Sequence, residues 1–270
     1  MATIETASGT TIYYEEHGEG EPLLCVHGLA TDTLGWVLQV PAFSKRHRTV
    51  VFDNRDVGQS SMAQAEYEVT DMAADALALA DALELKTFHL LGVSMGGAIA
   101  QEMALAAPDR IRTLNLAVTF AGSGAWGTSL AATWADRVRR SSREQHVEEL
   151  LLLTLSEELF EDAAKLEFAR NMMLQNPHPQ DPEAFSRQLS ASGRHDTRDR
   201  LASLTMPVHV IAAEHDLLVP VWKSDEIAAL IGGSKLTVIE GAPHGVQFER
   251  AEEFNELVLD FIAEHEPATV

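Results

Sequence analysis

The stretch Gly92-Val93-Ser94-Met95-Gly96 lies where an apolar run gives way to a helical pattern. Residues 87–93 predict a buried strand, and residues 96–107 predict an Ala-rich helix that ends before Pro108. A serine on such a strand-turn-helix corner takes a cramped backbone conformation that exposes its hydroxyl, and the flanking glycines leave room for it. We therefore predict that Ser94 is a nucleophile rather than an ordinary serine in a tight turn.

A nucleophilic serine needs a base and an acid that orients the base, because a hydroxyl near neutral pH is a poor nucleophile. In folds with this serine corner, the partners follow in the chain order serine, acid, histidine. Strand-like residues 208–213 run into Glu214-His215-Asp216, and strand-like residues 235–240 run into Gly241-Ala242-Pro243-His244-Gly245. Both segments follow the carboxyl ends of strands, where open α/β sheets place their binding and catalytic residues.

Ser94, Asp216 and His244 form the predicted catalytic triad. Glu214 is the alternative acid, but it lies nearer the body of its strand, so we favour Asp216. His244 stands between a proline and a glycine in a short loop, which suits a base held in place. His209 is expected inside a strand. Five other histidines are expected in polar or helical, solvated surroundings: His17, His47, His146, His178 and His265.

Two backbone N–H groups are predicted to stabilise the oxyanion of the tetrahedral intermediate. One belongs to Met95, which follows the nucleophile. The other belongs to Leu29, because the apolar strand predicted at residues 22–26 leads into the loop His27-Gly28-Leu29-Ala30. His27 itself is expected to brace this loop by hydrogen bonding.

The chain resembles the α/β-hydrolase family over nearly its whole length. Residues 9–14 look like the opening strand of the family, His27-Gly28 like its oxyanion loop, and residues 52–60 like its loop after the next strand. The predicted triad matches the catalytic positions of the family. The resemblance implies an α/β-hydrolase fold: a mostly parallel eight-stranded sheet flanked by helices, with a helical cap inserted after strand 6. Residues 53–60 are expected to form a salt-bridged turn that supports the oxyanion loop.

The pattern changes after the strand-like residues 111–118. No further strand is expected until about residue 207, and a break is expected at residues 176–179. Helices are predicted between these strands at residues 130–143, 144–155, 157–174 and 182–192. We interpret residues 1–123 and 201–270 as the two parts of the α/β-hydrolase core, and residues 124–200 as the helical cap.

A cap over the site excludes water and shapes the pocket, so specificity is expected there. The candidate substrate-binding residues are Trp126, Met172 and Val219. Other apolar cap residues that could line the pocket are Trp134, Phe168 and Met173.

Composition agrees with one domain of this class and one insertion, because 270 residues that are 46 % hydrophobic can fill a large core. A formal net charge of −21 disfavours nucleic acids and anionic membranes as partners. No basic region precedes an apolar run at the amino terminus, and no stretch reaches transmembrane length, so a soluble cytoplasmic protein is expected. Its single cysteine, Cys25, is expected to be buried and cannot form an intrachain disulfide. The oligomeric state is left open, with a homodimer among the options.

The predicted function is serine hydrolysis of a carboxylic ester or lactone of a small organic substrate, through an acyl-enzyme on Ser94. No metal or organic cofactor is indicated, because histidines and carboxylates lack zinc-site spacing and no G-x-G-x-x-G opens a helix. Two alternatives remain: a carbon–carbon hydrolase of meta-cleavage products and a small-molecule receptor on the same fold. An intact triad favours the enzyme, since a pure binder has no chemical need for it.

Three subgroups of the family share features with the chain. The segment at residues 244–249 is similar to the meta-cleavage-product hydrolases, although Gly245 and Val93 replace the aromatic residue and asparagine usual there. The loop at residues 241–245 resembles the cofactor-free haloperoxidases and aryl esterases, although Leu29 stands where they commonly have tryptophan. The 3-oxoadipate enol-lactonases share the Ser-Met-Gly-Gly elbow and a similar helical cap.

Overall fold

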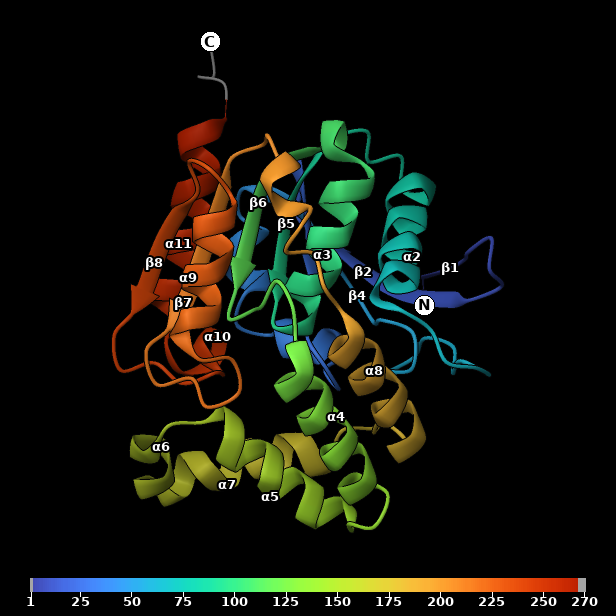
Figure 1. Ribbon diagram of the computed structural model, residues 1–270, viewed down its shortest axis with the longest axis vertical. Coiled ribbons are helices and arrows are strands. Elements are labelled where there is room, and N and C mark those ends of the chain that lie inside the picture. The colour runs from blue at the N-terminus through green and yellow to red at the C-terminus, as the bar shows by residue number, and fades with distance from the viewer. Residues whose placement is uncertain (1, 267–270) are drawn as a thin grey trace.

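A sheet of eight strands forms the centre of the structure, a computed structural model that describes residues 2–266 (Figure 1). The strands are β1 (Ala2–Glu5), β2 (Thr11–His17), β3 (Glu21–Val26), β4 (His47–Phe52), β5 (Phe88–Val93), β6 (Ile111–Ala117), β7 (Val208–Ala213) and β8 (Lys235–Ile239). They lie in the order β1-β2-β4-β3-β5-β6-β7-β8. β2 pairs antiparallel with both β1 and β4, and every other pairing is parallel. The predicted mostly parallel, eight-stranded α/β-hydrolase sheet is therefore confirmed.

Two helical layers cover the sheet, because alternate residues of the central strands point to opposite faces. Leu90 of β5 joins a core with helices α2 (Val69–Ala82), α3 (Met95–Ala106) and α9 (Val221–Leu230). Leu91, the next residue, joins a core on the other face with α1 (Val40–Phe43) and α11 (Ala251–His265). Both faces of β5 are thus buried, which explains its continuous apolar sequence.

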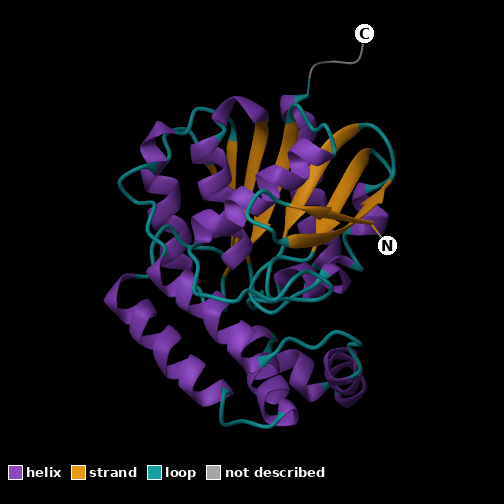
Figure 2. Ribbon diagram, turned by 90° about the vertical axis from the view of Figure 1, so that its right-hand side faces the viewer, coloured by secondary structure: helices purple, strands orange, loops and turns teal. Residues whose placement is uncertain are grey.

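Five helices follow β6 and form the cap: α4 (Gly124–Val138), α5 (Arg143–Thr154), α6 (Glu157–Glu161), α7 (Ala163–Leu174) and α8 (Pro182–Arg194). Figure 2 shows them as a separate layer below the strands. The short helix α10 (Val246–Glu249) and the 3-10 helices η1 (Thr33–Trp36), η2 (Pro108–Arg110) and η3 (Leu201–Ser203) complete the fold. The helical cap expected after strand 6 is confirmed. The predicted core extends over residues 1–123 and 201–270, of which residue 1 and residues 267–270 lie outside the described residues.

Two helix boundaries in the cap differ from the prediction. α4 spans Gly124–Val138 rather than residues 130–143, because it packs closely on α8: a Cβ atom on Gly193 would lie 2.9 Å from the Cβ of Ala131. The predicted helix at residues 157–174 is two helices, because the side chain of Asp162 accepts a hydrogen bond from the Lys165 N–H (3.1 Å) and starts α7 afresh.

The cap is fastened to the core on two sides. On the α8 side, the guanidinium of Arg187 donates two hydrogen bonds of 2.8 Å to the carboxylate of Asp56, which is fully buried. On the other side, the Gly245 N–H donates to the carbonyl of Thr154 (2.7 Å), so the end of α5 contacts the loop of His244. Among residues 2–266, no helix is both long and apolar enough to cross a membrane.

Candidate active site

The turn from β5 into α3 holds Ser94 in a strained backbone conformation. Its φ is +57° and its ψ is −124°, a region that residues with a Cβ rarely adopt. The surrounding backbone approaches so closely that a Cβ on Gly92 would lie 2.4 Å from the Gly96 carbonyl oxygen. This packing holds the half-buried Ser94 at the carboxyl edge of the sheet, where the cap begins.

A chain of hydrogen bonds joins the three residues of the predicted triad. His244 Nε2 lies 3.0 Å from Ser94 Oγ, and His244 Nδ1 lies 2.7 Å from Asp216 Oδ2. The other oxygen of Asp216 accepts from the N–H groups of Leu218 (2.8 Å) and Val219 (2.7 Å), which fixes the carboxylate. With Nδ1 protonated toward the acid, Nε2 is free to take the serine proton.

Glu214, the alternative acid, does not reach the histidine. Its carboxylate accepts instead from the Gly241 N–H (2.8 Å) on the neighbouring loop. Asp216 is therefore the carboxylate that the structure places against His244.

The loop after β3 lies directly against the serine. A Cβ on Gly28 would lie 2.9 Å from the Ser94 Cβ, so only glycine allows this approach. Within the described part of the chain, the N–H groups of Leu29 and Met95 have no hydrogen-bond partner. Both are therefore free to donate to an oxyanion beside Ser94.

His27 and residues 53–60 support this loop. His27 Nδ1 accepts from the Gly28 N–H (2.7 Å), and its ring packs edge-on against Trp36 at 4.6 Å between ring centroids. Burial lowers the pKa of His27 to about 3, so the imidazole is neutral. The Asn54 side chain donates to the His27 carbonyl (3.1 Å), while Asp53 accepts from the Thr33 N–H (2.7 Å).

A cavity of about 860 Å³ opens between the core and the cap, with Ser94 and His244 in its wall. The expected substrate-binding residues Trp126, Met172 and Val219 all line it. Trp126 and Met172 remain solvent-exposed, whereas Val219 is buried beside the acid. Most of the remaining cap residues that face this space are aliphatic or aromatic, such as Leu130 and Phe168.

Two histidines that the sequence predicted to be solvated, His47 and His146, are buried or half-buried in the structure. His47 is buried (3 % exposed) at the start of β4, because its strand lies inside the sheet. His146 is half-buried in α5 and lines the cavity. Its helical spacing from Leu150 was the available signal, since residues four apart share one face of a helix.

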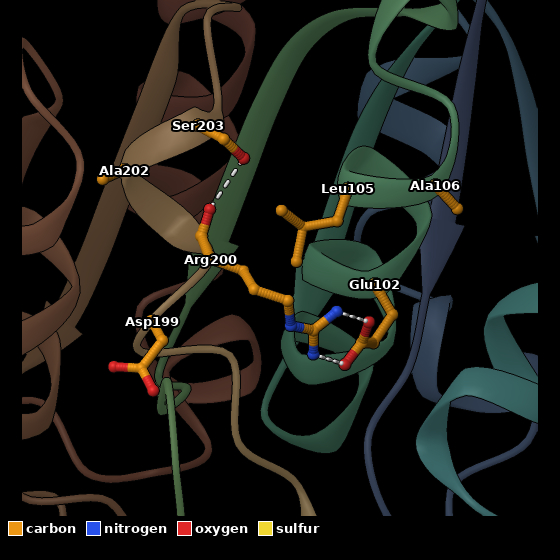
Figure 3. Close-up of a pocket in the computed structure, with 7 residues that line it drawn as sticks. All are labelled: Glu102, Leu105, Ala106, Asp199, Arg200, Ala202 and Ser203. Carbon is orange, nitrogen blue, oxygen red and sulfur yellow. Dashed lines mark hydrogen bonds and ion pairs between the residues drawn. The ribbon is translucent and has the colours of Figure 1, made fainter.

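A second hollow, of about 680 Å³, lies between α3 and η3 (Figure 3). Two of its charged groups pair with each other, since Arg200 Nη1 donates to Glu102 Oε2 (2.8 Å), and the Ser203 hydroxyl donates to the Arg200 carbonyl (2.7 Å). No residue of the triad lines it. Over residues 2–266, no group of three or more His, Cys, Asp or Glu side chains could hold a metal ion.

Comparisons with known proteins agree with this fold. The family model of the α/β hydrolase fold matches residues 21–251. A putative carbamate hydrolase RutD of Azorhizobium caulinodans is 28 % identical over 254 residues, which are 94 % of this chain and 95 % of the relative. 2-Hydroxy-6-oxononadienedioate/2-hydroxy-6-oxononatrienedioate hydrolase 2 of Pseudomonas putida is 30 % identical over 93 % of this chain and 91 % of its own length.

Solved structures show the same similarity. The enol-lactonase of Burkholderia xenovorans LB400 superposes with a TM-score of 0.87 at 25 % identity, covering 97 % of this chain and all of that one. A thermophilic esterase of Thermogutta terrifontis superposes with a TM-score of 0.87 at 28 % identity, covering 98 % of this chain and 99 % of the esterase. The chain belongs to the α/β-hydrolase fold family.

Proposed function

We propose that this protein is a serine hydrolase that cleaves a carboxylic ester or lactone of a small, uncharged organic substrate. The observation that supports this function is the hydrogen-bonded chain from Ser94 through His244 to Asp216, opening into a cavity of about 860 Å³. A cavity of this size can enclose most of a small organic molecule.

The geometry suggests a two-step acyl transfer. Ser94 Oγ attacks the carbonyl carbon while His244 Nε2 takes its proton, and Asp216 stabilises the imidazolium that forms. The oxyanion accepts from the N–H groups of Leu29 and Met95. His244 then protonates the leaving alkoxide, which departs from a lactone as the tethered hydroxyl. In the second step His244 activates water, which attacks the acyl-enzyme and releases the carboxylic acid.

The charges along the cavity favour an uncharged substrate. Two acids that line the cavity accept hydrogen bonds from the protein: Asp32 accepts from the Asn176 side chain (2.7 Å), and Glu249 accepts from Ser156. Lys165 pairs with Asp162 at 3.1 Å.

The other three cations that line the cavity also contact protein groups. Arg250 lies 3.9 Å from the carboxylate of Glu158, which is the last acid of the cavity. Arg143 donates to the Met173 carbonyl (3.1 Å), and Lys223 donates to the Gly122 carbonyl. An anionic substrate would have to compete with the carboxylates that pair with Lys165 and Arg250, whereas an ester or lactone would not.

A carbon–carbon hydrolase is the second candidate, because the Pseudomonas putida relative named for such a substrate is 30 % identical over nearly its whole length. Its substrate is a dicarboxylate by name, and two of the four cations of this cavity, Lys165 and Arg250, already pair with a carboxylate.

The test is a turnover screen of p-nitrophenyl esters, lactones, p-nitrophenyl carbamates and meta-cleavage dienoates, with the native chain and the Ser94→Ala variant. We expect esters or lactones to give the highest kcat/KM, and Ser94→Ala to lose that activity. Preferred cleavage of dienoates would favour the second candidate. Binding without turnover of any substrate would favour a receptor.

A further inference from the structure

One face of helix α5 lines the wall of the cavity. Its cavity-lining residues recur at intervals of three and four, as one stripe of an α-helix does. They are Arg143, His146, Val147, Leu150, Leu151 and Thr154. Three of these six side chains are aliphatic, and His146 is the one imidazole of the stripe.

The contacts of α5 show which end of the stripe lies beside the catalytic triad. The carbonyl of Thr154 accepts from the Gly245 N–H (2.7 Å), so the carboxyl end of α5 lies beside His244. His146 precedes Thr154 by eight residues, or about 12 Å of helix at 1.5 Å per residue. Val147, Leu150 and Leu151 occupy the wall between these two positions. The stripe therefore runs from the catalytic end through an aliphatic section to an imidazole.

The imidazole of His146 has no partner within the protein. Over residues 2–266 neither ring nitrogen forms a hydrogen bond, and Nδ1 is enclosed, which leaves Nε2 for a molecule in the cavity. The ring packs edge-on against Phe185, at 4.7 Å between centroids, and Phe185 in turn packs against Trp134 at 5.3 Å. Burial also lowers the pKa of His146, so the ring is neutral at neutral pH.

A polar ring without a partner is unfavourable for an apolar wall, where leucine or phenylalanine would pack without leaving nitrogen atoms unpaired. The charged side chains of the same cavity all have partners, whereas His146 and its neighbour Trp134 each keep a buried nitrogen without one. With Nδ1 enclosed, the neutral ring presents Nε2 alone to the cavity, and an Nε2–H group donates to an acceptor such as the oxygen of a ketone, ester or hydroxyl group.

We infer that His146 is a specificity-determining residue, which recognises a neutral oxygen function in the part of the substrate beneath the cap. The aliphatic section of α5 would contact the apolar segment that joins this oxygen to the scissile carbonyl. The substrate class is then an ester or lactone with a second oxygen function remote from the bond that is cleaved. This inference rests on the proposed ester hydrolase function.

The test compares two graded series of p-nitrophenyl alkanoates, one with a ketone near the end of the chain and one with a methylene in its place. For the native chain we expect the ratio of kcat/KM, ketone over methylene, to peak at one chain length. His146→Phe keeps the ring against Phe185 but removes both nitrogens, so it should lower that ratio roughly tenfold, the loss of about one hydrogen bond. His146→Gln, which keeps a donor and an acceptor, should retain part of the ratio.

The matched control is His178→Phe, the same substitution in the cap at an exposed residue that does not line the cavity. It should leave the ratio at the native value. A native ratio near one at every chain length, or a ratio that His146→Phe leaves unchanged, would overturn the inference while esters are still hydrolysed. If no ester is hydrolysed, the proposed function fails instead. Calorimetric binding of the same pairs to Ser94→Ala then decides whether His146 recognises the ketone.

Discussion

At the residue scale, close backbone contacts around the serine explain the strained corner. Gly28 lies so near that an added Cβ would meet the Ser94 Cβ at 2.9 Å and the Val93 carbonyl oxygen at 3.1 Å. The loop that carries the Leu29 N–H would have to move to relieve this contact. The position of the Leu29 N–H group thus depends on the absence of a Cβ atom at Gly28.

We therefore expect Gly28→Ala to lower kcat by roughly 10²- to 10³-fold, the usual effect of losing one oxyanion donor. The measurement is steady-state hydrolysis of the preferred ester, with circular dichroism to verify folding. Gly232→Ala is the control, because a Cβ there would meet nothing within 4 Å. A folded Gly28→Ala variant with native kcat would contradict the assignment of Leu29.

Asp216 holds the ring of His244 through one carboxylate oxygen, 2.7 Å from Nδ1. Asp216→Asn should keep the fold but present the wrong hydrogen-bonding group to the imidazole, lowering kcat by roughly 10⁴-fold if the serine-protease behaviour applies. Glu214→Gln should retain most activity, because Glu214 contacts Gly241 rather than the histidine. The reverse result would show that the wrong carboxylate has been chosen.

Sequence order was enough to group Ser94, Asp216 and His244, because a parallel sheet brings the ends of its strands to one edge. It was not enough for His146. Its neighbours in the chain are mixed, since Gln145 is polar and Val147 is apolar, and the leucine that shares its face, Leu150, comes one helical turn further on. The position of that face relative to the cavity depends on tertiary packing.

At the element scale, the attachment of α8 to the core decides how the cap is held. Arg187 and Asp56 form a bidentate pair, and the Gln188 side chain donates to the Arg55 carbonyl (2.8 Å) beside it. Asp56 has no exposed surface, so its charge depends on these contacts. It also adopts a φ of +70°, which aspartate tolerates better than most residues.

We expect Arg187→Ala to lower the free energy of unfolding by about 3 kcal/mol, because it leaves a buried carboxylate without its cation. Replacing Asp56 with asparagine in the same chain should recover part of the loss. The measurement is urea unfolding at 25 °C. Arg140→Ala, which breaks an exposed pair with Asp136, is the control and should cost less than about 1 kcal/mol. Equal losses for both arginines would contradict this role of α8.

Strands were predicted more closely than cap helices for a physical reason. β5 and β7 are buried on both faces, so their apolar sequences identify them without any knowledge of neighbours. The first turns of α4 contain Gly124, Gly127 and Thr128, which are poor helix formers, and they are helical because α8 packs against them. Such tertiary contacts do not show in the local pattern.

At the scale of the whole molecule, buried histidines couple stability to pH. Burial lowers the pKa of His27 and His89 to about 3, and of His195 and His209 to about 4. Between those values and the ordinary value of 6.5, the unfolded chain binds more protons than the native one. Stability therefore falls as pH drops below about 6.5. Asp53, whose pKa burial raises to about 6, acts in the opposite direction.

We expect the free energy of unfolding to decrease from pH 6.5 to pH 5.5, with each of these histidines contributing at most about 1.4 kcal/mol per pH unit. Urea unfolding across this range measures the slope. His89→Gln removes one titrating group and should make the slope shallower, whatever its effect at pH 7.5. A variant with the native slope would show that His89 does not titrate on unfolding.

The central claim is that Ser94 is the nucleophile of a hydrolase. The most direct measurement is labelling of the intact protein with a fluorophosphonate, followed by mass spectrometry of its peptides. We expect a single adduct on Ser94, parallel loss of ester hydrolysis as labelling proceeds, and neither labelling nor hydrolysis in Ser94→Ala. An adduct on a different serine, or hydrolysis that persists in Ser94→Ala, would contradict the account.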